Sequence, residues 1–212
     1  MRVTSLHKLS LSILVTLLAM MLLLIATGAD AVDESAKSKF TVDDHSFKCI
    51  SAMTPARHFY VDNLLGNLEG TLAVAKSGVG DYPEGSVVQL VPTEIMVKHE
   101  KGFNAETRDW EFFLIKADKD GSKILSRGFA EVNNQFGMNC FACHIHAKPQ
   151  YDFICEQGHG CDPIPLTRPM LAALQRTDPR CMNHPPLSAE DAQALKDLGE
   201  VFKSLKGGGK NP

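Results

Sequence analysis

The chain has 212 residues, of which 44% are hydrophobic and 22% are charged, and its formal net charge is −3. This length suits one domain of ordinary size with additional segments at either end, and the composition is typical of a soluble globular protein. The slightly acidic balance argues against a nucleic-acid-binding protein, because such a surface needs clustered cations.

Residues 1–31 show the three-part pattern of a secretory signal peptide. Arg2 and Lys8 precede an apolar run over residues 13–26, and Ala29-Asp30-Ala31 then offers a cleavage site between small residues. The alternative is an uncleaved membrane anchor, although the run is shorter than the roughly 18 apolar residues that a spanning helix usually needs. In both cases we expect the rest of the chain to lie outside the cytoplasm, in the periplasm.

Residues 32–55 are mostly polar, and we expect them to form an irregular lead-in segment. Residues 57–61 follow as a short strand-like run. Asp62 or Asn63 can then cap a helix, because apolar residues recur at spacings of three and four over residues 64–75. Two glycines just beyond this stripe predict the end of the helix.

Four further strands are predicted from β-branched and aromatic residues. They cover residues 86–91, 94–97, 110–117 and 123–129. Pro92 predicts a bulge or an edge between the first two. An Asp-Lys-Asp-Gly sequence predicts a hairpin turn between the last two.

Residues 156–212 form an extension rich in proline and cysteine, with two predicted helices. The first covers residues 169–176. The second covers residues 188–205, opens with a capping-box variant at Ser188 and carries a leucine and phenylalanine stripe of the kind that packs against a neighbour.

Cys140, Cys143 and His144 form a Cys-x-x-Cys-His motif. This is the spacing of a c-type haem attachment site, because each thiol can add to one porphyrin vinyl group and the histidine can then bind the iron. Zinc sites and thiol–disulfide couples share the cysteine spacing. Zinc would need a second ligand pair, for which Cys155 and Cys161 are poorly matched, and a redox couple needs no histidine. We therefore expect one covalently attached haem c with His144 as the iron ligand.

The other four cysteines allow three disulfide pairings, among which the sequence does not choose. Cys155 and Cys161 flank a short glycine-containing loop and could close locally. Cys49 and Cys181 would then tie the lead-in segment to the extension. Such disulfides suit an exported protein.

The sixth coordination position of the iron separates two functions. Electron carriers fill it with methionine or histidine, whereas ligand-binding and catalytic haems leave it open. Met170 and Met182 are candidate sixth ligands in the extension. The motif lies two-thirds along the chain, which argues against the small all-helical cytochromes c, whose motif is near the N-terminus.

The order of motifs resembles the cytochrome P-460 family, which includes the β-sheet cytochrome c′-beta proteins. The matching positions, within residues 57–155, are Arg57-x-x-Tyr60-Val61-Asp62, Gly85-x-Val87, Val97-Lys98 with Phe103, Glu106 and Trp110, Cys140-x-x-Cys143-His144, and Asp152. This resemblance implies an α+β fold, mainly an antiparallel β-sheet with a few helices holding a c-type haem, in a homodimer. It also implies a haem on His144 with an open distal face.

The family's enzymes oxidise hydroxylamine, and its cytochrome c′-like members bind nitric oxide. The resemblance implies that Arg57 is a distal-pocket arginine, with a salt bridge to a haem propionate or to Asp62 as the alternative. The distal carboxylate of the enzymes corresponds to Glu131 or Gln135. Their haem-linked lysine corresponds to Gln89-Leu90, which cannot make that bond, so enzymatic activity stays open.

We therefore expect an exported mono-haem c-type cytochrome whose open site binds or redox-transforms a small nitrogen oxide, such as nitric oxide or hydroxylamine. The alternative is a periplasmic electron-transfer cytochrome with a six-coordinate haem. We expect a redox-partner cytochrome and no nucleic acid among its partners. The expected segments are a signal peptide (1–31), a lead-in (32–55), a haem domain (56–155) and a helical extension (156–212).

Overall fold

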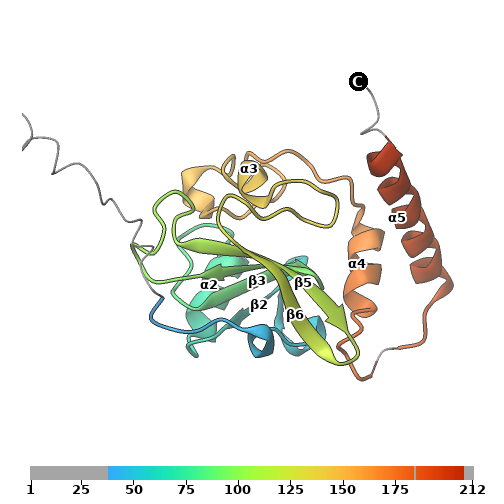
Figure 1. Cartoon of the computed structure of the whole chain (residues 1–212), viewed down its shortest axis with the longest axis horizontal. Helices are drawn as coiled ribbons and strands as arrows, with labels where there is room; N and C mark the ends of the chain where they lie inside the picture. Colours follow the sequence, from blue (N-terminus) through green and yellow to red (C-terminus); the bar gives the residue numbers. More distant parts are fainter. Residues whose placement is uncertain (1–37, 184, 208–212) are drawn as a thin grey trace, which may run out of the picture. The chain divides into compact units, whose positions relative to one another are not determined.

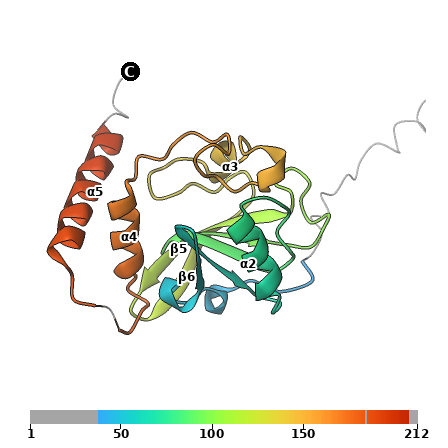
Figure 2. The same cartoon turned by 180° about the vertical axis from the view of Figure 1, so that it is seen from behind.

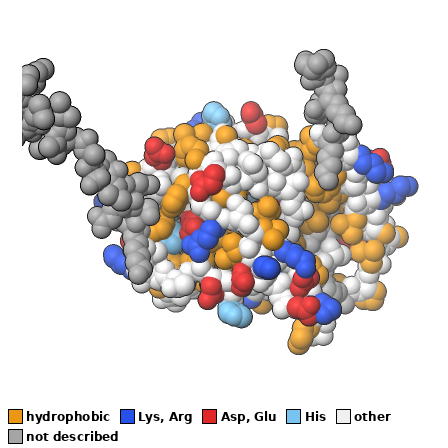
Figure 3. Space-filling view, in the orientation of Figure 1, with side chains coloured by type: hydrophobic (Ala, Val, Ile, Leu, Met, Phe, Trp, Pro, Cys, Tyr) orange, Lys and Arg blue, Asp and Glu red, His pale blue; other side chains and the backbone are white. Residues whose placement is uncertain are grey.

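The computed structural model describes residues 38–183 and 185–207. The predicted signal peptide, residues 1–31, lies outside the described residues. Within the described ranges, no helix is both long and apolar enough to cross a bilayer. On the face seen in Figure 3, acidic and basic side chains are interspersed among apolar ones.

Six strands form one antiparallel sheet, and their order in the sheet follows their order in the chain (Figure 1). The strands are β1 (Thr54–Ala56), β2 (Phe59–Asn63), β3 (Ser86–Val91), β4 (Glu94–Lys98), β5 (Trp110–Asp118) and β6 (Gly121–Gly128). The expected α+β class with a mainly antiparallel sheet is therefore confirmed. Each strand pairs with its neighbours in sequence, so short turns suffice for most connections.

The strand predictions are confirmed to within two residues at each end. The predicted hairpin turn joins β5 to β6, where Asp118 pairs with Gly121. The irregularity expected near Pro92 is a bulge, because the register of β3 against β4 shifts between Gln89 and Val91.

Strand β1 was not predicted, since its residues fall at the end of the expected irregular lead-in. It has three residues, one of them Pro55, and is too short to show a strand period. Strand β1 forms because it pairs with β2, with Thr54 opposite Val61.

Helix α2 (Leu68–Ser77) connects β2 to β3. The prediction of its start is wrong, because Asn67 is the N-cap and accepts a hydrogen bond from the Gly70 amide. Asn63 instead ends β2, and its side-chain oxygen accepts from the amides of Leu65 and Asn67 at 2.9 and 3.1 Å. The predicted end is confirmed: Gly78 adopts a φ of 74°, a left-handed conformation that favours glycine.

Alternate residues of the central strands point to opposite faces of the sheet. On one face, Val88, Met96 and Phe112 pack with α2 and with the segments around residues 132 and 153. On the other face, Val87 and Phe113 pack against the chain's first described segment. That segment contains two short 3-10 helices, η1 (Asp44–Ser46) and η2 (Ile50–Ala52).

The remaining helices follow the sheet, and α4 and α5 lie side by side (Figures 1 and 2). They are α3 (Cys140–His144), the 3-10 helix η3 (Pro149–Tyr151), α4 (Arg168–Arg176) and α5 (Ala189–Gly207). The two predicted helices of the extension are thus confirmed. The Ser188 hydroxyl accepts a hydrogen bond from the Asp191 amide at 3.0 Å, as the capping-box pattern predicts.

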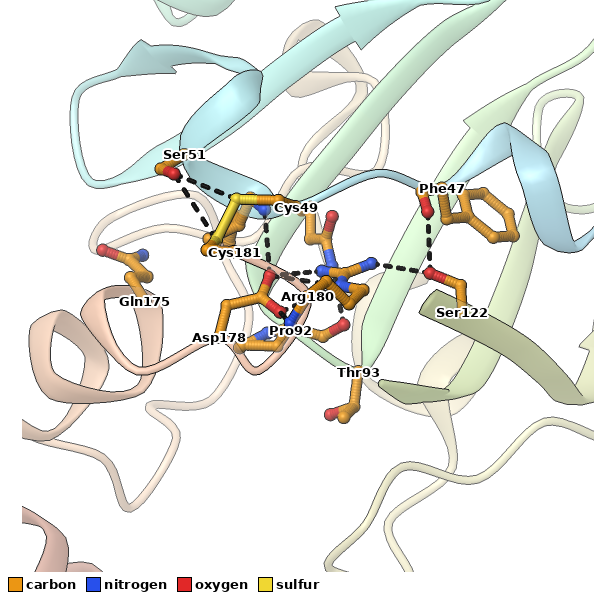
Figure 4. Close-up of polar contacts among 12 residues, drawn as sticks. Phe47, Cys49, Ser51, Pro92, Thr93, Ser122, Gln175, Asp178, Arg180 and Cys181 are labelled. Carbon is orange, nitrogen blue, oxygen red and sulfur yellow. Dashed lines mark hydrogen bonds and ion pairs between the residues drawn. A yellow bond between two sulfur atoms is a disulfide. The ribbon is translucent and has the colours of Figure 1, made fainter. Parts of the chain in front are cut away.

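Both disulfide pairings considered from the sequence are present, Cys155–Cys161 and Cys49–Cys181. Beside Cys49–Cys181, the buried carboxylate of Asp178 pairs with Arg180 and accepts from the Ile50 amide at 2.9 Å (Figure 4). These contacts fasten the extension to the segment before the sheet.

Replacing Cys49 and Cys181 together by serine should lower the free energy of unfolding by about 2–5 kcal/mol, because the cross-link closes a long loop. Urea unfolding of the exported protein measures the loss. The matched control is the double serine variant of Cys155 and Cys161, whose sulfurs close a loop with a sequence separation of 6 rather than 132. A larger loss in this control would contradict the prediction.

Candidate functional site

The Cys-x-x-Cys-His motif forms α3, a single helical turn above the sheet in Figures 1 and 2. Asn139 caps it by accepting a hydrogen bond from the Ala142 amide at 2.9 Å. The Cys140 amide donates to the carbonyl of buried Val132 at 2.9 Å. These two contacts fix where the turn begins, and the spacing of the motif then places Cys140, Cys143 and His144 on one short helix.

The imidazole of His144 is held from two sides. Its ring packs against Phe112 of β5, with ring centroids 5.3 Å apart. Its Nδ1 lies 2.6 Å from the Phe153 carbonyl oxygen. Because a carbonyl only accepts, Nδ1 carries the proton and Nε2 keeps a free lone pair. Burial lowers the pKa of His144, which favours this neutral form.

Cys140 and Cys143 are free and half-buried. Burial raises the pKa of Cys140 to about 12 and also raises that of Cys143. A thiol–disulfide couple needs the opposite, a lowered thiol pKa that supplies thiolate near neutral pH. The thiols of the motif are therefore protonated, which disfavours the redox-couple interpretation.

Within the described part of the chain, the zinc interpretation also lacks a second pair of ligands. Cys155 and Cys161 form a disulfide and supply no thiolate. Among the described residues, the one cluster of three ligand-type side chains joins Cys49, Asp178 and Cys181, of which the cysteines are disulfide-bonded.

A cavity of about 1090 Å³ lies beside α3, and Cys140, Cys143 and His144 all line it. This is slightly above the range of about 300–1,000 Å³ for ligand and cofactor pockets. Apolar side chains from three strands and from α4 form much of its wall: Val88, Leu90, Met96, Phe112 and Leu171. The cavity can therefore take a large flat apolar group beside two thiols and an imidazole.

Glu94 is a wall residue that sequence reasoning missed. It starts β4 and shares a face with Met96, two residues further along. Burial raises the pKa of its carboxyl, and its contact is the Gln135 amide, 3.4 Å from Oε1. The alternation of side chains along a strand predicts that Glu94 and Met96 share a face. The sequence alone does not predict that this face borders α3.

The three predicted distal side chains do not belong to the cavity wall. Arg57 is exposed and pairs with Glu156, which does line the cavity. Glu131 is exposed, and Gln135 donates from its side chain to the Thr93 hydroxyl. Their distal roles stay predictions, whereas Cys140, Cys143 and His144 do lie together.

The alternative partner considered for Arg57 is also engaged elsewhere, since Asp62 pairs with Lys48 at 2.5 Å. Of the two residues that the resemblance aligns with the family's lysine, Leu90 lines the cavity and Gln89 does not. Gln89 is buried and donates to the carbonyls of Val91 and Pro92. Among the described residues, the wall contains no lysine.

Neither methionine suggested from the sequence as a sixth ligand lines the cavity. Met182 is 95% exposed, and the sulfur of Met170 lies 3.5 Å from the Thr167 amide. Met96 and Met138 line the cavity instead.

Before any group is attached, Cys140 should resist alkylation. Because its pKa is raised to about 12, its thiolate fraction at about pH 8 should be orders of magnitude below that of free cysteine, and it should increase with pH. Mass spectrometry after iodoacetamide treatment of the haem-free Cys143→Ser protein measures the rate. Alkylation of Cys140 as fast as that of free cysteine at this pH would contradict its burial.

Comparisons of the chain with protein-family models, with curated proteins and with solved structures found no match. The likeness to the cytochrome P-460 family therefore rests on the motifs of the sequence.

Proposed function

We propose that this chain is an exported mono-haem c-type cytochrome of the cytochrome P-460 type, whose iron binds or redox-transforms a small nitrogen oxide such as nitric oxide or hydroxylamine. One observation carries the proposal. Two protonated thiols and an imidazole with a free Nε2 lone pair line one cavity of about 1090 Å³.

The residues of the cavity fit the attachment chemistry of haem c. The Cys140 and Cys143 thiols would each form a thioether, with the sulfur bonding one vinyl carbon and the thiol proton going to the other. His144 Nε2 would be the iron ligand, because its Nδ1 is bonded to the Phe153 carbonyl. When bound, haem supplies a redox-active iron that coordinates small ligands.

The rest of the cavity wall suits both the apolar ring of a porphyrin and its charged propionate groups. The apolar side chains of Leu90, Met96 and Phe112 would contact the ring and exclude water. Arg168 also lines the cavity and could pair with the negatively charged propionates.

Glu94 supports a site that handles a polar ligand. The half-buried carboxyl of Glu94 has a raised pKa because of its desolvation, so it stays protonated further toward neutral pH and can donate a hydrogen bond from its oxygen to a bound nitrogen oxide. The apolar surroundings strengthen such a bond. We therefore propose Glu94, which lines the cavity, as the polar donor instead of Glu131 or Gln135, which do not.

Leu90 in the cavity wall favours ligand binding over the hydroxylamine oxidation of the family's enzymes, because its side chain offers no amine for the third covalent link. Lys98, another lysine of the family pattern, pairs with Asp152 at 2.8 Å and lies outside the wall. The attachment we propose therefore has two thioethers.

One observation favours the six-coordinate electron carrier as a second candidate. Met96 and Met138 line the same cavity, and a thioether sulfur is the sixth iron ligand in many electron-carrying cytochromes c.

Export is supported by the signal-peptide pattern and by the two disulfides, since disulfides persist in oxidising compartments. A homodimer and a redox-partner cytochrome stay predictions from the family resemblance.

Covalent haem and its coordination are tested by a peroxidase-stained denaturing gel and a visible spectrum. We expect stained protein that loses the stain when Cys140 and Cys143 are both changed to alanine, and a high-spin ferrous haem that takes up nitric oxide. The serine variant of Cys155 and Cys161, two cysteines outside the motif, should keep the stain. A low-spin spectrum with a methionine-to-iron band would favour the electron carrier.

Glu94 should make the retention of nitric oxide depend on pH. The carboxyl donates while it is protonated, below its raised pKa, so the donated bond is lost and dissociation accelerates as pH rises through that pKa. Loss of one such bond should speed dissociation about 10-fold. Stopped-flow measurement of nitric oxide release against pH gives this profile.

Two variants sharpen that measurement. Glu94→Gln keeps a donor at every pH and should flatten the profile, whereas Glu94→Leu should release the ligand fast throughout. Glu131→Gln changes an exposed carboxyl and should behave as the wild type. A profile that persists in Glu94→Gln would exclude this carboxyl as the donor.

A further inference from the structure

A buried ion pair joins the end of β4 to the segment that follows α3. The Lys98 ammonium lies 2.8 and 2.9 Å from the two carboxylate oxygens of Asp152, a residue that is 0% exposed. The ammonium also donates to the Arg108 carbonyl at 2.6 Å and lies 5.1 Å from the centre of the Trp110 ring. The carboxylate accepts from the Tyr82 amide at 2.8 Å. Both charges are thus well partnered, which a buried pair requires.

This pair holds a backbone turn that L-residues rarely adopt. Asp152 has a φ of 45° and Phe153 a φ of 66°, so two successive residues other than glycine lie in the left-handed region. Such conformations persist only where the surroundings impose them. The Asp152 carboxylate accepts three hydrogen bonds, two from the Lys98 ammonium of β4 and one from the Tyr82 amide, and these supply that constraint.

The turn decides where the next carbonyl points. The Phe153 carbonyl oxygen lies 2.6 Å from His144 Nδ1, and the Phe153 ring stacks on Phe141 of α3 at 6.2 Å. The Ile154 amide donates back to the Tyr151 carbonyl at 2.9 Å, which closes the turn. A chain of contacts therefore connects β4 to the imidazole: Lys98 of β4 pairs with Asp152, and the carbonyl of the next residue, Phe153, contacts His144 Nδ1.

We propose that Lys98 and Asp152 are positioning residues for His144. By fixing the Phe153 carbonyl, they keep the proton on Nδ1, orient Nε2 and strengthen the hydrogen bond through which a proximal histidine becomes a stronger electron donor to iron. This inference rests on the proposed haem function. If the pair were purely structural, it would stabilise the fold without affecting the tautomer or the hydrogen bond of the His144 imidazole.

The test uses Asp152→Asn and Lys98→Met in the full exported chain, with two readouts. In ferrous holoprotein, resonance Raman spectroscopy gives the iron–histidine stretching frequency, which should shift down as the Nδ1 hydrogen bond weakens. In haem-free protein, nitrogen-15 NMR gives the His144 tautomer, and both variants should lose part of the Nδ1–H population.

The matched control is Glu111→Gln. Glu111 is a buried carboxylate on the opposite face of the same sheet, paired with Arg127 at 2.7 Å and lying 2.7 Å from His99 Nε2. This variant should unfold at a lower urea concentration while keeping the wild-type Raman frequency and tautomer.

Lys98→Arg keeps the cation. Both readouts in this variant should therefore lie closer to wild type than those of Lys98→Met.

Lower stability with an unchanged stretching frequency and an unchanged tautomer in both main variants would overturn the positioning role. If Asp152→Asn does not fold, Asp152→Glu displaces the carboxylate while keeping its charge, and the same readouts decide. A wild-type chain without covalent haem would overturn the proposed function instead. The NMR readout on the haem-free chain then still decides whether the pair sets the tautomer.

Discussion

The geometry beneath the Cys-x-x-Cys-His turn depends on the buried contact between Lys98 and Asp152. Burying two charges costs solvation free energy, which their mutual attraction offsets only with good geometry and further hydrogen bonds. Here the Tyr82 amide, the Arg108 carbonyl and the Trp110 ring supply those contacts. This charge pair in the core thereby holds the turn whose Phe153 carbonyl accepts the hydrogen bond from His144 Nδ1.

The C-terminal extension contributes a wall of the cavity as well as stability. Leu171 and Arg168 of α4 line the cavity, and the Gln175 amide donates to the carbonyls of His58 and Leu90. The Cys49–Cys181 disulfide and the buried Asp178 fasten this segment to the start of the fold. α5 adds a second layer, in which Phe202 stacks on Phe136 before the motif at 4.3 Å.

The wall combines an apolar interior with few ionisable groups. Among its described residues the wall contains no lysine, and Leu90 lies in it, which is why the attachment we propose has two thioethers only. Burial raises the pKa of the Glu94 carboxyl in that wall. These residues are the basis on which we propose ligand binding instead of hydroxylamine oxidation.

The sequence by itself determined the local features: the motif, the hairpin at Asp118 and the helices of the extension, because turn chemistry and residue spacing act over short distances. It left the disulfide pairing open and missed β1, which exists only through its pairing with β2. The tertiary structure alone decided which side chains meet the motif. It placed Glu94 and Met96 in the wall, and left Glu131 and Met170 outside it, because packing of one sheet face against α3 joins residues far apart in sequence.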